Sequence, residues 1–175
     1  RSDVRLLALP RELFLRMTRE DELLERGTAG RGIETRLERL WRNRRLLAEV
    51  FALKRLSASR RHELALECET VEAAAGQVLV KKNARERDAY VLVGGLLEVD
   101  RGDGHKHLCR PFSIVGERTA IGEIKSRSAT VRALEPSSLL RIPGDSFSRL
   151  YNSVPAMRFD IDKLLEERRS QARRA

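Results

Sequence analysis

The residues best suited to bind a small molecule lie between positions 116 and 129. Gly116 permits close approach of the backbone to a ligand, and Glu117 begins a short helical turn whose first N–H groups can bind an anion. Arg127 supplies a fork of donors that matches phosphate oxygens, and Ser128 adds a hydroxyl. Glu117 also offers an acceptor for sugar hydroxyls. Phosphate donors beside a single carboxylate indicate a sugar phosphate as the ligand rather than a bare anion.

The segment that holds these residues interrupts a region with the pattern of antiparallel strands. From Thr70 onward, short runs of Val and Leu are separated by turn residues at regular intervals, which is typical of a β-barrel or jelly roll. Gly102 and Gly104 fall where a hairpin needs a positive φ. Strands are predicted around Val71 and over residues 77–80, 89–93, 96–99, 107–110, 113–115, 129–134 and 138–142.

Helices are predicted on both sides of the strands. On the N-terminal side, residues 18–27 have the cap and early acids of a helix, residues 33–53 carry apolar positions at spacings of three and four, and a third helix follows from Ser59. On the C-terminal side, an apolar stripe covers residues 147–165. Pro155 is expected to divide this stripe between two helices, because proline cannot continue a helix from the preceding turn.

One stretch resembles a known ligand-binding motif. Gly116-Glu117, a short helical turn and then Arg127-Ser128-Ala129 resemble the phosphate-binding cassette of cyclic-nucleotide-binding domains. Such domains occur in the bacterial catabolite activator family, in protein kinase A regulatory subunits and in cyclic-nucleotide-gated channels. Residues 71–79 and 88–99 are also similar to the opening hairpin and the strand–glycine–strand element of that family. The resemblance covers roughly residues 56–165.

The resemblance implies a role for each part of the cassette. Glu117 would accept a hydrogen bond from the ribose 2′-OH, and Arg127 would pair with the cyclic phosphate. Gly116 and Ser128 would add backbone or hydroxyl hydrogen bonds, Ala129 would fit beneath the phosphate, and the last helix would form a lid over the base. The predicted ligand-binding residues are therefore Gly116, Glu117, Arg118, Thr119, Arg127, Ser128 and Ala129.

Ser128 bears on which base the ligand carries. In the resembled kinase subunits, a small apolar residue after the arginine goes with cAMP and a threonine goes with cGMP. Bacterial cAMP receptors have serine at this place. Ser128 therefore favours cAMP, with cGMP as the alternative ligand. No cofactor is expected besides this ligand.

The fold class predicted from these features is α+β, an antiparallel β jelly-roll barrel flanked by N-terminal helices and C-terminal lid helices. We expect residues 1–56 to form a helical extension, residues 57–165 to form the cyclic-nucleotide-binding barrel with its C-terminal helices, and residues 166–175 to form a basic tail. The predicted function is a sensor module that relays ligand binding through its flanking helices to an effector. Those helices also offer a surface for a homodimer.

The alternative is a degenerate barrel without a ligand. In that case Glu117 and Arg127 would form a structural ion pair, and the basic helices over residues 32–56 would bind a protein or nucleic acid as a scaffold. The formal net charge is +9, but acids are interleaved with the bases, and no helix-turn-helix follows the last predicted helix. We therefore do not expect this chain itself to bind nucleic acid.

Other chemistry is not expected. No Gly-x-Ser-x-Gly sequence or Walker loop is present, so catalysis is not predicted. His105, His107 and Cys109 alternate at a spacing that a metal ion could use, but without a predictable fourth ligand a solvated strand end is the better interpretation and no metal is predicted. Two cysteines without a disulfide framework, and no apolar run long enough to span a membrane, favour a cytoplasmic protein.

Overall fold

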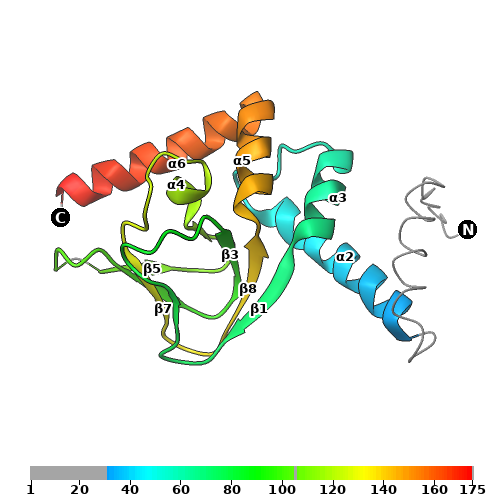
Figure 1. The fold of residues 1–175 in the computed structure, drawn as a ribbon, viewed down its shortest axis with the longest axis horizontal. Coiled ribbons are helices and arrows are strands. Elements are labelled where there is room, and N and C mark those ends of the chain that lie inside the picture. Colours follow the sequence, from blue (N-terminus) through cyan, green and yellow to red (C-terminus); the bar gives the residue numbers. More distant parts are fainter. Residues whose placement is uncertain (1–30, 105, 175) are drawn as a thin grey trace, which may run out of the picture. The chain divides into compact units, whose positions relative to one another are not determined.

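The structure is a computed structural model that describes residues 31–104 and 106–174 (Figure 1). The helix predicted over residues 18–27 lies outside these residues. The chain divides into two compact units, one that ends at Trp41 and one that begins at Arg42. All strands of the described residues belong to the second unit.

From residue 31 onward, two helices precede the strands, α2 (Arg31–Glu49) and α3 (Ala58–Glu67). α2 ends before Leu53, where the apolar spacing predicted its end, because the Leu53 N–H donates to the carbonyl of Val50 in a tight turn, at 2.9 Å. Phe51, which the predicted apolar stripe included, is 46% exposed as a result. The predicted helix from Ser59 is present as α3.

The strands lie close to their predicted positions. They are β1 (Glu69–Ala73), β2 (Val78–Val80), β3 (Ala89–Gly94), β4 (Leu97–Asp100), β5 (Lys106–Cys109), β6 (Ile114–Val115), β7 (Thr130–Ala133) and β8 (Ser137–Ile142). They form two four-stranded sheets with the orders β1-β8-β3-β6 and β2-β7-β4-β5. Every pairing is antiparallel. This arrangement confirms the predicted α+β jelly-roll class.

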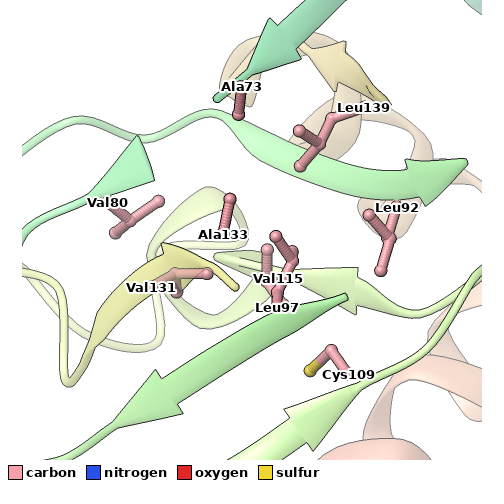
Figure 2. Packing of buried hydrophobic residues seen from close by; sticks show 9 residues of the cluster. All are labelled: Ala73, Val80, Leu92, Leu97, Cys109, Val115, Val131, Ala133 and Leu139. Atoms are coloured by element: carbon pink, nitrogen blue, oxygen red, sulfur yellow. The ribbon is translucent and has the colours of Figure 1, made fainter. Parts of the chain in front are cut away.

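The core lies between the two sheets. Figure 2 shows side chains of both sheets gathered there, among them Leu92 and Leu139 of the first sheet and Leu97 and Val131 of the second. Successive side chains of a strand point to opposite faces, so every second residue of these strands enters the core. Leu92, Leu97 and Leu139 are fully buried. This burial favours the observed register, since a slip of one residue would move the apolar set out of the space between the sheets.

The β4–β5 hairpin has the geometry that its glycines predict. Gly102 and Gly104 have φ values of +73° and +90°, in the left-handed region that side chains with a Cβ rarely adopt. The carboxylate of Asp100 accepts a hydrogen bond from the Gly102 N–H at 2.7 Å and so closes the turn. The hairpin brings β5 beside β4 at the edge of the second sheet.

Three helices follow or interrupt the strands, α4 (Glu117–Ala120), α5 (Gly144–Ser153) and α6 (Pro155–Arg174). Pro155 separates α5 from α6, as predicted. The apolar stripe is packed inward, since Phe147, Met157 and Ile161 are fully buried. In Figure 1, α6 passes over α4 and continues across the strands.

The described helices and the two cysteines bear on membrane insertion and on thiol chemistry. Within the part of the chain that the structure describes, no helix has both the length and the apolar composition that crossing a membrane requires. Cys68 and Cys109 are free thiols, and both are buried. Burial, together with the charge of Glu67, raises the pKa of Cys68 to about 12, so this thiol stays protonated at neutral pH.

Candidate functional site

A cavity of about 380 Å³ has walls formed by α4, the second sheet and α6. This volume falls within the roughly 300–1,000 Å³ typical of small-molecule sites. Every residue predicted to bind ligand lies in its wall: Gly116, Glu117, Arg118, Thr119, Arg127, Ser128 and Ala129. The sheet and α6 contribute other lining residues, which include Val99, His107, Cys109, Leu165, Arg168 and Arg169. The structure therefore gathers the cassette around one space.

Gly116 connects β6 to α4 with a φ of +82°. A Cβ atom at this position would lie 2.3 Å from Nη1 of Arg127 and 2.9 Å from the carbonyl oxygen of Asp88. Real Cβ atoms do not come this close to other atoms, so any residue except glycine would force the Arg127 guanidinium to move and would strain the backbone. The close approach expected at Gly116 is thus made to the guanidinium of Arg127.

Arg127 carries a buried positive charge whose described hydrogen bonds go to carbonyls and not to a carboxylate, although the charges of Glu86, Asp88 and Glu117 act on it from nearby. The residue is 3% exposed, and its Nη1 and Nη2 donate to the carbonyls of Gly116 and Asp88, at 2.9 and 2.6 Å. Nε is buried and has no hydrogen-bond partner. Burial lowers the pKa of Arg127. Because a guanidinium has five N–H donors, this one retains donors for an anion.

The backbone around Arg127 is also held in place. Its N–H donates to the carbonyl of Ala84 at 2.8 Å, and its own carbonyl accepts from the N–H of Asn83 at 2.9 Å. These two bonds fix the point from which the guanidinium enters the wall of the cavity. The next two residues also face the cavity: Ser128 is exposed, and Ala129 is 8% exposed.

Asp88 links Arg127 to the start of α5. Its carbonyl accepts from Arg127, and its carboxylate accepts from the N–H of Gly144 at 3.0 Å and from Nε of Arg141 at 2.7 Å. The sequence interpretation treated Asp88 only as the start of a strand element. No local pattern announces this role, because its partners are far away along the chain.

Glu117 is paired with an arginine from the far end of the chain. Nη1 of Arg168, in α6, lies 2.6 Å from Oε1 of Glu117, and Nη2 donates to the carbonyl of Ile114 at 2.8 Å. Glu117 is 4% exposed, so its charge is almost wholly removed from water. The ion pair between Glu117 and Arg127 that the alternative hypothesis assumed is not what forms, because both hydrogen bonds of Arg127 go to carbonyls.

The sequence interpretation missed Arg168, since it placed residues 166–175 in a basic tail. The residue spacing could have predicted the position of Arg168. Ile161, Leu165 and Arg168 follow one another at spacings of four and three, so they share one face of α6. Ile161 and Leu165 are buried. An arginine that continues such a face is directed toward the protein rather than away from it.

A second group of ion pairs fastens α6 beside the cavity. Arg118 donates to the carboxylate of Glu123 through Nε and Nη2, at 3.1 and 3.0 Å, and Arg169 of α6 also pairs with Glu123. The hydrogen bond from Arg118 lowers the pKa of Glu123 most, and the bond from Arg169 lowers it further. Thr119, the remaining α4 residue of the cassette, is 3% exposed. α6 is therefore tied to α4 and to the turn after it.

The alternating His and Cys residues do not form a metal site in the described part of the chain. His105 lies outside the described residues, and among the described ones no three His, Cys, Asp or Glu side chains are grouped so that they could hold a metal ion. His107 and Cys109 line the cavity instead. Burial, and then the charges of Arg168 and Arg101, lower the pKa of His107, so its imidazole is neutral at pH 7.

Comparison with known proteins identifies the class of domain. Residues 70–154 match the family model of the cyclic nucleotide-binding domain. The resemblance drawn from the cassette is thereby confirmed, and this part of the chain is a domain of that family.

Solved structures share this fold. The sensor domain of the transcriptional regulator DNR from Pseudomonas aeruginosa matches with a TM-score of 0.65 and 18% identity, over 76% of this chain and 92% of that one. The regulatory domain of Toxoplasma gondii PKA in a co-crystal with cAMP gives 0.64 and 20%, over 77% and 51%. At these identities the likeness establishes the fold alone.

Curated relatives are longer proteins. The Pycsar effector protein PaPycTIR from Pseudomonas aeruginosa is 28% identical over 100 residues, which is 57% of this chain and 32% of that protein. The lysophospholipase NTE1 from Cryptococcus neoformans is 31% identical over 101 residues, which is 54% of this chain and 6% of that protein. The chain thus spans about a third of the first relative and a small fraction of the second.

Proposed function

We propose that this domain binds a cyclic nucleotide in the cavity, with the phosphate against Arg127. The observation that carries the proposal is the buried guanidinium: Arg127 is 3% exposed, its hydrogen bonds go to neutral carbonyls, and its Nε has no partner. A buried charge without an opposite charge is costly. A phosphate in the cavity would supply that charge and would accept the remaining N–H groups.

The sugar would be bound by Glu117. A carboxylate has two oxygens that each accept more than one hydrogen bond, and Arg168 occupies Oε1. Oε2 is then available to accept the ribose 2′-OH. Arg168 would act as a positioning residue, because its bonds to Glu117 and to the Ile114 carbonyl hold the carboxylate in one orientation. Its positive charge would also attract the anionic ligand.

We propose cAMP as the first ligand to test, and cGMP as the second. Ser128 is exposed in the cavity wall, beside Arg127. Its hydroxyl can donate to a phosphate oxygen, as the resemblance to bacterial cAMP receptors implies. A serine supplies the small side chain that the cAMP form of the cassette tolerates, without the branched methyl of threonine.

The domain would act as a sensor without catalytic chemistry of its own. Glu117 is bonded to α6 through Arg168, and Arg127 is connected to α5 through the backbone and carboxylate of Asp88. Ligand contacts at Glu117 and Arg127 would therefore bias the positions of both helices, which is how binding would reach an effector. The effector, by analogy with the longer relatives, would be a further domain or a partner protein.

Isothermal titration calorimetry with cAMP and with cGMP tests the proposal. The nucleotide-free chain should bind at least one of them with 1:1 stoichiometry. Arg127→Lys, which keeps the charge but loses the forked pair of donors, should weaken binding about tenfold to a hundredfold, since a hydrogen bond to a charged group contributes about 1.5–3 kcal/mol. Thermal unfolding of the variant, monitored by circular dichroism, establishes that it is folded.

Arg110→Lys is the matched control. Arg110 is exposed, lies outside the cavity wall and undergoes the same chemical change. This variant should bind like the unmodified chain. Absence of binding by the unmodified chain, in calorimetry and in thermal shift with millimolar cAMP and cGMP, would contradict the proposal and leave the scaffold function. Equal affinity of the Arg127→Lys variant and the unmodified chain would contradict the site.

A further inference from the structure

The floor of the cavity carries a single cross-strand row in which three residues are valine and the fourth is histidine. The register pairs Val80 with Val131, Val131 with Val99, and Val99 with His107. The row therefore crosses the whole second sheet, from β2 through β7 and β4 to β5. All four residues line the cavity. The valines make an apolar surface, and His107 ends it at the edge of the sheet.

The position of His107 on β5 fixes the side toward which its imidazole points. Directly paired residues of antiparallel strands project to the same face, with Cβ atoms about 4.5–5.5 Å apart. His107 therefore shares the cavity face with Val99. His107 is itself exposed at the sheet edge, and Leu108, the next residue, is 50% exposed but outside the cavity wall. Cys109 returns to the inner face and is 2% exposed.

His107 lies in the part of the cavity where we expect the base of a nucleotide whose sugar is bound by Glu117. Glu117, Arg168 and His107 line the same cavity, and Arg168, which bonds to Glu117, also acts through its charge on His107. Leu165, one turn earlier on α6, lines the same cavity. A base attached to that sugar would meet the valine row on one side and Leu165 on the other. His107 would then face the polar edge of the base.

We propose that His107 is the residue that reads the edge of the nucleotide base. This inference rests on the proposed function of the cavity. A neutral imidazole has one donor and one acceptor nitrogen, and the edges of nucleobases present donors and acceptors in patterns that differ between bases. The valines and Leu165 hold any base by apolar contact and cannot tell one from another. His107 is the group in this row that can distinguish one base from another.

Calorimetric titration of cAMP, cGMP, cCMP and cUMP into the unmodified chain and into His107→Ala tests the inference. One neutral hydrogen bond contributes about 0.5–1.5 kcal/mol. The affinity for the best-bound nucleotide should therefore fall about fivefold in His107→Ala, while the affinity for the worst-bound one changes little. The ratio between best and worst should narrow by the same factor. His107→Gln, which keeps a donor and an acceptor, should restore part of the ratio.

Leu108→Ala is the control, since it shortens the neighbouring side chain on the opposite face of the same strand. It should leave all four affinities unchanged. An equal loss for all four nucleotides in His107→Ala, or no loss for any, would overturn the role of His107 and leave the proposed function intact. Absence of binding by the unmodified chain would overturn the proposed function, and the role of His107 with it.

Discussion

Gly116→Ala is the sharpest test of how the site is built. A left-handed backbone costs a residue with a Cβ about 1–2 kcal/mol. The new Cβ would also lie 2.3 Å from Nη1 of Arg127, so the guanidinium must move away. That movement breaks its bonds to the carbonyls of Gly116 and Asp88, and an unsatisfied buried polar group costs about 1–3 kcal/mol. We expect the free energy of unfolding to fall by about 3 kcal/mol or more.

Gly122→Ala separates the two contributions. Gly122 has a φ of +80°, almost the same as Gly116, but a Cβ there would have no atom within 4 Å. This control therefore contains the backbone strain without the collision and should lose about 1–2 kcal/mol. Urea unfolding gives both values. Calorimetry should show that Gly116→Ala also weakens cAMP binding roughly tenfold or more, because the displaced guanidinium is the group proposed to bind the phosphate.

Two results would refute this reasoning. If Gly116→Ala and Gly122→Ala lost the same stability, the guanidinium of Arg127 would not pack against the backbone at Gly116. If Gly116→Ala lost stability but bound cAMP with unchanged affinity, Arg127 would support the fold without contacting the ligand.

Two further predictions concern the ion pairs of α6. Arg168→Gln should weaken cAMP binding about tenfold in calorimetry, because Glu117 loses the charge that orients it, whereas unchanged or tighter binding would mean that Arg168 competes with the sugar. Arg118 and Arg169 hold the pKa of Glu123 below its usual 4.5, so the stabilisation from its charge is complete above about pH 4.5 and is lost as the pH falls through the lowered value. Glu123→Gln should therefore melt at a lower temperature than the unmodified chain at pH 7 and at nearly the same temperature near pH 3, and an equal difference at both would contradict the pairing.

The strands and the cassette were predictable because their signals are local. Each strand is a short apolar run with a turn residue on either side, and Gly102 and Gly104 mark the hairpin that the structure contains. Gly116 and Arg127 were found in the same way, through a motif in which they lie eleven positions apart and which folds into one wall of the cavity. Local patterns of this kind depend little on what packs against them.

The opposite wall was not predictable from such signals. Arg168 meets Glu117 across 51 residues, and its position in a basic run suggested a solvated tail. His107 was weighed with its neighbours as a metal ligand or a solvated strand end; it is exposed as the second interpretation predicts, but the register with Val99 also places it in the cavity wall. The contacts of both residues form only when α6 and β5 pack around the same cavity. A short sequence pattern cannot predict such contacts.

The two ends of the proposed ligand are tied to different helices. Arg127, which we propose binds the phosphate, donates to the carbonyl of Asp88, whose carboxylate accepts from the first N–H of α5 at Gly144. Glu117, which we propose binds the sugar, is paired with Arg168 of α6. A cyclic nucleotide bound as proposed would contact both Arg127 and Glu117 and so affect both α5 and α6. A phosphate alone would contact only Arg127 and so affect only α5. The response of α6 would therefore distinguish a complete nucleotide from a simple anion, because α6 is connected to the residue that binds the sugar.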